Sequence, residues 1–257
     1  MRVFVDAVAV LAPGLPDWTS ARAVMRGDAR YAHAPMPPPA PASLAPAERR
    51  RSSPTVRLAI AVAEQALQGS SHRPEELAMV FSSYEAAGII THQLCEVLAG
   101  SREVSPTQFH NSVHNAPSGY YSIAMNAKHA ASSICRGEWS FAAGLLSAAA
   151  QVAADEVPLL YVCYDSPLPH PVSDVMPVIE ATAIALVLTP LSHAGTLAGW
   201  DISLVDSCAA GWPAWMPQSW QANACSRGFP LLATLAGVAE GTILPLSPDL
   251  GLEVTRC

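Results

Sequence analysis

The sequence is short of charge. Only 14% of its 257 residues are charged, whereas 51% are hydrophobic. The 21 acidic and 14 basic residues give a formal net charge of −7, which argues against nucleic acid as a partner because phosphate backbones bind basic surfaces. So few charges leave much of the surface apolar, and we expect another protein chain to cover part of it.

A membrane-spanning run is also lacking. A helix that crosses a bilayer needs about 20 consecutive apolar residues, and the longest candidates, 141–154 and 181–188, are shorter. The apolar start of the chain contains Asp6 and alternates with a period of two, which favours a strand over a signal peptide. We therefore expect a cytoplasmic protein without a membrane span.

Paired cysteines and metal-ligand spacings are missing as well. The six cysteines form no CxxC pair and no zinc-ligand pattern. Most lie among apolar residues, where a free cysteine behaves as a small hydrophobic side chain. We predict structural cysteines, no metal site and no cofactor. The six are Cys95, Cys135, Cys163, Cys208, Cys225 and Cys257.

What the sequence does contain is an alternation of strand and helix patterns. Helices are predicted at 55–67, 86–98, 118–127, 139–153 and 230–238. Strands are predicted at 3–11, 77–82, 130–135, 159–164, 181–188 and 197–205, with a final hairpin at 243–246 and 250–254.

The sequence also allows predictions for three segments that connect these elements. The strands 181–188 and 197–205 are expected to pair with each other around a turn at 192–195. Residues 26–54 look irregular and Pro-rich, and 101–117 looks like a polar loop. The uncharged strand 130–135 indicates burial on both faces, and the helix 139–153 is apolar all round and therefore central. The order predicts an α/β fold with one helix sandwiched in the middle.

The stretch Ser105-Pro-Thr-Gln-Phe-His-Asn-Ser-Val-His-Asn115 resembles a loop of β-ketoacyl synthases. The similarity continues without gaps to residue 165, and residues 46–67 resemble the ketosynthase-like N-terminal family of aryl polyene pigment clusters. The resemblance implies a truncated thiolase-like α/β fold, with an N-terminal half-type five-stranded mixed sheet around a buried central helix. It covers most of residues 1–206, the expected domain. Residues 207–257 are expected to form an atypical Trp-rich tail, packed on this domain or on a partner.

The sequence departs from the family pattern in two ways, and each departure removes catalytic residues. Ketosynthases place a nucleophilic cysteine at the N-terminus of the buried helix, where the helix dipole favours the thiolate. By the gapless match this position is Glu138, which cannot form an acyl thioester. The family's catalytic histidines and lysine belong to a C-terminal half that would begin where this chain stops. The resemblance therefore predicts no catalytic residue in this chain.

Some type II polyketide systems pair an active ketosynthase with an inactive subunit, the chain-length factor, and this sequence looks like a shortened member of that class. The resemblance implies a heterodimer with a full-length β-ketoacyl-ACP synthase, whose acyl tunnel this chain would shape, and contact with an acyl carrier protein through the complex. The residues expected to reach the partner's tunnel are Gln108, Phe109 and His110. Those expected to pair across the dimer axis are Ala130, Ala131, Ser132, Ser133, Ile134 and Cys135.

Other interpretations stay open. The chain could be a stand-alone acyl-thioester enzyme that uses Cys135 with His110 or His114, or a homodimeric ligand-binding module. Glu138 could promote decarboxylation rather than fill a buried position. Arg49-Arg50-Arg51 could meet an acidic carrier protein or form a solvated turn. Three tail tryptophans could form a ligand cage, although packing is the commoner role of such residues; they are Trp212, Trp215 and Trp220.

Overall fold

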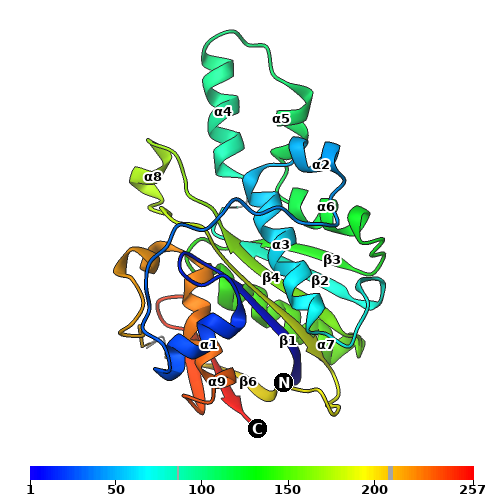
Figure 1. Ribbon diagram of the computed structural model, residues 1–257, viewed down its shortest axis with the longest axis vertical. Coiled ribbons are helices and arrows are strands. Elements are labelled where there is room, and N and C mark those ends of the chain that lie inside the picture. Colours follow the sequence, from blue (N-terminus) through cyan, green and yellow to red (C-terminus); the bar gives the residue numbers. More distant parts are fainter. Residues whose placement is uncertain (86, 208–210) are drawn as a thin grey trace.

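The computed structural model describes residues 1–85, 87–207 and 211–257. One mixed sheet runs through the molecule, with its eight strands in the order β3-β2-β4-β5-β1-β6-β8-β7 (Figure 1). The strands are β1 (Arg2–Leu11), β2 (Ala78–Ser83), β3 (Ala131–Cys135), β4 (Leu159–Asp165), β5 (Thr182–Thr189), β6 (Ala198–Val205), β7 (Gly241–Pro245) and β8 (Gly251–Arg256).

Helices connect most of these strands. The α-helices are α1 (Trp18–Arg26), α2 (Pro46–Arg51), α3 (Pro54–Gln68), α4 (Gly88–Ala99), α5 (Pro106–Asn111), α6 (Ala116–Ala124), α7 (Ser140–Asp155), α8 (Val172–Val175) and α9 (Phe229–Leu235). The short 3-10 helices are η1 (Pro74–Glu76), η2 (Gln218–Ala222) and η3 (Cys225–Gly228). Within the described ranges, no helix combines the length and the apolar character needed to cross a membrane.

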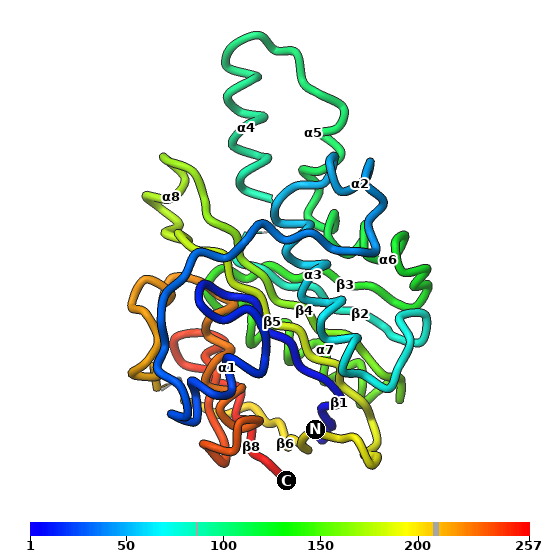
Figure 2. Tube along the Cα trace, in the orientation of Figure 1, coloured from blue at the N-terminus to red at the C-terminus, as the bar shows by residue number. Residues whose placement is uncertain are grey.

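The helices cover both faces of the sheet, so the core has two layers (Figures 1 and 2). Helices α3 and α6 close one layer, whereas α7, α1 and α9 close the other. Helix α7 lies close to the sheet at Gly144, where a β-carbon would come within 2.6 Å of the Tyr161 ring. The Tyr161 hydroxyl donates to the carbonyl of Phe141 at 2.6 Å and so fixes the first turn of α7 over β4.

In the middle of strand β1, the alternation of side chains between the two faces of the sheet shifts by one residue. Val3 and Val5 belong to the same core layer as Val8 and Val10, so one extra residue stands between the two pairs. The register of β1 against β5 shifts at this point, between Val5 and Ala7. A β-bulge of this kind turns one side chain out of the regular alternation, and here the side chain is that of Asp6.

The predicted α/β class with a mixed sheet and a central helix is confirmed, as is the final hairpin, formed by β7 and β8. The sheet has eight strands rather than five, because β6, β8 and β7 extend it beyond β1. The expected pairing of 181–188 with 197–205 is wrong. Strand β1 lies between β5 and β6 and pairs antiparallel with both.

Other local predictions also need correction. The segment 26–54 contains α2, the segment 101–117 contains α5, and α1 was not predicted. The strand 130–135 is not buried on both faces, because β3 stands at one end of the sheet order and is partly exposed. Small uncharged residues suited an edge position as well as a buried one. Cys208 lies outside the described residues.

Candidate functional site

Strands β2, β3 and β4 run parallel, so their C-terminal ends lie at one edge of the sheet, where α7 begins. Glu138 stands two residues before the first residue of α7. Its carboxylate forms a hydrogen-bonded ion pair with the guanidinium of Arg227, which comes from η3 in the tail. A carboxylate suits this end of a helix, and Arg227 balances its charge.

The tail covers the start of α7. Gly228 passes over Phe141 so closely that a β-carbon there would come within 2.2 Å of the Phe141 ring. The backbone N–H of Cys225 donates to Asp165 Oδ2 at 2.8 Å, and the backbone N–H of Tyr84 donates to Asp165 Oδ1 at 2.8 Å. Asp165 therefore joins the end of β4 to the tail and to the end of β2.

Two carboxylates beside this point titrate abnormally. Asp165 is 3% exposed, and its burial raises its pKa from an ordinary 3.8 to about 6, although the N–H groups of Cys225 and Tyr84 act in the opposite direction. Burial also raises the pKa of Glu85, against the backbone N–H groups of Gly88 and Ala87 and the charge of His114. A perturbed carboxylate in a cleft would be a candidate general acid or base.

The cavity that borders Asp165 and Glu85 is too small for a substrate. It has a volume of about 10 Å³, which holds one water molecule at most. It is lined by Thr55, Ser83, Tyr84, Glu85, Tyr164, Asp165, Ser166, Leu168 and Val178. The space beside these two carboxyl groups therefore does not admit an acyl chain.

The structure does not assemble a cysteine–histidine pair. The Cys135 thiol donates to the carbonyl of Tyr84 at 2.8 Å, and desolvation raises the pKa of this thiol above its usual value. The His110 ring packs edge-on against Tyr120, with their centroids 5.9 Å apart. In the part of the chain that the structure describes, neither His110 nor His114 is hydrogen-bonded to Cys135. A reactive thiol needs the opposite environment, with a lowered pKa.

Strand β3 pairs with β2 along one side, and no described strand pairs with its other side. Ala131 and Cys135 are exposed, and the three residues between them are half-buried. The hydroxyls of Ser133 on β3 and Ser118 on α6 lie 3.1 Å apart, so strand and helix border one surface. Ile123 on α6 is 85% exposed, and further large apolar side chains are exposed elsewhere on the molecule: Leu98 (53%) on α4, Phe109 (64%) on α5 and Val113 (47%) between α5 and α6.

The three residues expected to reach a partner's tunnel lie on α5. This helix and α4 project from the body of the molecule (Figures 1 and 2). Phe109 and His110 are exposed, whereas Gln108 is half-buried. Asn111 anchors the end of α5, since its side-chain amide donates to the carbonyl of Arg51 at 3.0 Å.

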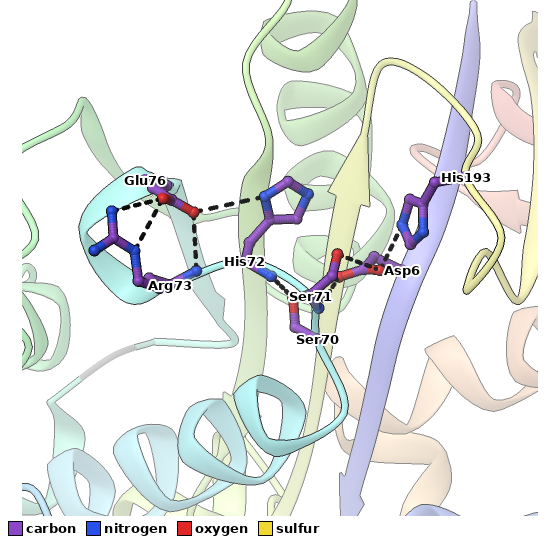
Figure 3. A network of polar contacts seen from close by, with 7 residues as sticks. All are labelled: Asp6, Ser70, Ser71, His72, Arg73, Glu76 and His193. Atoms are coloured by element: carbon purple, nitrogen blue, oxygen red, sulfur yellow. Dashed lines mark hydrogen bonds and ion pairs between the residues drawn. The ribbon is translucent and has the colours of Figure 1, made fainter.

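A second polar cluster lies around Asp6, which is 3% exposed (Figure 3). Its carboxylate binds Ser70 Oγ at 2.5 Å, the Ser71 N–H at 2.9 Å and His193 Nε2 at 2.7 Å. Burial raises the pKa of Asp6, but these hydrogen bonds and the charge of His193 outweigh it, so the net pKa lies below its usual value. The bond drawn between His72 and Ser70 comes from the His72 backbone N–H, which donates to Ser70 Oγ at 3.0 Å. Neither labelled imidazole is drawn bonded to a serine, so the cluster ties two turns to β1 and does not have the arrangement of a hydrolytic triad.

The tail tryptophans pack within the chain. Trp220 is fully buried and stacks on Phe229, with centroids 5.5 Å apart. Tyr31 lies against both Trp215 and Trp220, at 5.9 and 5.8 Å. Across the described residues, no group of three or more His, Cys, Asp or Glu side chains could hold a metal ion.

Several solved structures share this architecture. The ketosynthase ApeO in complex with its chain length factor ApeC from Xenorhabdus doucetiae matches with a TM-score of 0.76 at 19% identity, over 100% of both chains. An acyl-carrier protein complex of a type II polyketide ketosynthase, AntDE:AntF, matches with 0.76 at 11% identity, over 100% of this chain and 99% of that one. The ishigamide ketosynthase/chain length factor matches with 0.67 at 12%, over 99% of each. At such identities the likeness shows the fold, which is the thiolase-like fold of ketosynthases.

The sequence itself defines the family. Residues 22–213 match the model of the β-ketoacyl synthase N-terminal domain. The chain belongs to this family. The comparison with curated proteins gave no match.

Sequence reasoning missed Asp165 and the partner of Glu138, Arg227. Asp165 directly follows a fully buried apolar run, and a charge at that place is a signal that could have been used. Arg227 lies 89 residues from Glu138, and no local pattern links the two.

Proposed function

We propose that this chain is a non-catalytic, chain-length-factor-like subunit of a cytoplasmic type II polyketide ketosynthase of the aryl polyene kind. It pairs with an active β-ketoacyl-ACP synthase, stabilises it and shapes its acyl tunnel. The observation that carries the proposal is the start of α7. Where the resemblance puts a nucleophilic cysteine, this chain has Glu138, and its carboxylate is paired with Arg227.

The free side of β3 supports pairing with another chain. An unpaired strand edge exposes N–H and C=O groups that bind a further strand. Ala131, Ser132 and Ser133 carry small neutral side chains, which let a second strand approach closely. Ile123, which is 85% exposed on the neighbouring helix α6, also favours a protein partner over solvent. In this proposal β3 pairs with its counterpart in the ketosynthase.

The projecting arm supports the tunnel role. Phe109 presents an apolar ring that is 64% exposed, and a single chain gains nothing from this exposure. A partner that covers α5 would bury Phe109 with Gln108 beside it. A ring and a neutral amide suit the wall of an acyl tunnel, where a charge would be costly.

Helix α2 offers a basic surface to an acidic carrier protein. Arg51 is paired with Glu48 at 2.8 Å, and the Arg57 guanidinium binds the carbonyl of Ser52 at 2.6 Å. Arg49 and Arg50 carry no ion pair among the described residues, and Arg50 is exposed. We assign these two arginines to contact with the carrier protein in the assembled complex.

The experiment that tests the proposal is co-expression of this chain with full-length β-ketoacyl-ACP synthase. We expect a heterodimer by light scattering that Ala131→Asp abolishes, because a carboxylate at a paired strand edge would be buried without a partner. Ala150→Asp on α7 is the matched control, since Ala150 is exposed on a helix and takes no part in strand pairing. A heterodimer that survives Ala131→Asp contradicts the assigned edge. A chain that forms no complex with any synthase contradicts the function.

A further inference from the structure

A pocket of about 370 Å³ opens on the face formed by α2, α5 and α6, away from the closed start of α7. One wall is α6, and the opposite wall is the segment before α2. The Glu64 carboxylate holds that segment in place, because it accepts the backbone N–H groups of Ala42 at 2.9 Å and Ser43 at 2.7 Å. The lining residues that matter below are His110, Val113, Asn115, Gly119, Tyr120 and Ile123.

Gly119 shows that the pocket is kept open. A glycine inside a helix costs about 0.5–1 kcal/mol relative to alanine. Such a cost is usually explained by a close neighbour, yet a β-carbon on Gly119 would meet no heavy atom within 4 Å. Nothing inside the described chain requires this glycine. The space in front of it is therefore available to a group from outside.

The rim and the floor define what that group is. Ile123 (85% exposed) and Val113 (47% exposed) form an apolar rim. The lining also includes His110, Asn115 and Tyr120, whose polar side chains can form hydrogen bonds. The pocket thus fits an apolar body that carries one hydrogen-bonding group.

The position of the pocket indicates that the group which fills it comes from the partner subunit. The pocket wall α6 is bound to β3 through the contact between Ser118 and Ser133, so it borders the proposed pairing edge. We propose that the pocket receives a tyrosine or tryptophan side chain of the ketosynthase. Such amphipathic rings anchor protein interfaces. This inference rests on the proposed function and names an anchor point of its interface.

The test uses the complex of the full chain with the synthase that co-purifies with it. Gly119→Leu places an apolar side chain in the pocket, and its β-carbon meets no heavy atom within 4 Å. We expect it to raise the Kd of the complex at least about thirtyfold, as for the loss of an interface hot spot. Gly119→Ala is the matched control and should leave the Kd within about threefold with an unchanged or higher Tm. Ile123→Ser removes part of the rim at an exposed position and should also weaken the complex.

The outcomes separate the two proposals. If Ala131→Asp breaks the complex and Gly119→Leu leaves the Kd unchanged, the pairing edge stands and the anchor is wrong. If Gly119→Leu leaves the Kd unchanged but alters product length, the pocket holds an acyl chain instead, which also overturns the anchor. A complex that survives Ala131→Asp but is weakened by Gly119→Leu retains the anchor and refutes the edge.

Discussion

The carboxylate of Asp165 provides a sharp test of whether the polar groups near α7 are structural. Asp165 is 3% exposed, and its pKa is about 6 instead of 3.8. A carboxyl whose pKa is raised by folding stabilises the fold when it is protonated. Its contribution is therefore fully present below pH 3.8 and is lost as the pH rises through about 6.

The magnitude follows from these two pKa values. At about 1.4 kcal/mol for each pKa unit, the whole shift corresponds to about 3 kcal/mol, and ionisation of Asp165 lowers the free energy of unfolding by about 2.5 kcal/mol between pH 4 and pH 7. Asn resembles the protonated side chain and does not titrate. Glu85 contributes in the same direction, whereas Asp6, with its lowered pKa, stabilises the fold until the pH falls through its own pKa. The difference between wild type and Asp165→Asn isolates the one carboxyl.

The assay is urea unfolding of the wild-type and Asp165→Asn complexes between pH 4 and pH 7.5, followed by circular dichroism. We expect the difference in unfolding free energy to move by about 2.5 kcal/mol in favour of Asn as the pH rises. A difference that is constant across this range would refute the buried, protonated state. Condensation activity should stay within severalfold of wild type, and a loss of two orders of magnitude with an intact complex would show that Asp165 is catalytic.

The remaining predictions concern the partner. Phe109→Ala should enlarge the tunnel and lengthen the products by chromatography, and unchanged products would remove Phe109 from the tunnel wall. Glu138→Gln should keep condensation activity within severalfold of wild type, and a hundredfold loss in an assembled complex would make Glu138 catalytic. Arg49→Glu with Arg50→Glu should raise the KM for the carrier protein at least about tenfold at low salt and less at high salt. An unchanged KM would exclude α2 from carrier contact.

Strands that lie in the middle of the sheet were predictable from the sequence. The buried strands β2, β4 and β5 are apolar runs bounded by polar or Gly/Pro residues, and that pattern fixes their existence. Which strands pair with one another is harder to predict from the sequence. The short turn between β5 and β6 favoured a hairpin, but β1 occupies the place between them because its two hydrogen-bonding edges match both strands.

Short helices and long-range contacts were the harder part. The signal for α5 was available, since Pro106 follows Ser105 at a typical helix start, but the polar residues of 101–117 favoured a loop. The position of Glu138 before α7 could be inferred from the resemblance. Its pairing with Arg227 could not, because only the folded tail brings the two charges together.

Intact-protein mass spectrometry tests the central claim most directly. The purified complex would be incubated with acyl-carrier protein loaded with an acyl chain, in the absence of extender, and both subunits would be weighed. Our account predicts an acyl adduct on the ketosynthase subunit and an unmodified mass for this chain. An acyl thioester on this chain, at Cys135 or at any other cysteine, would contradict the account.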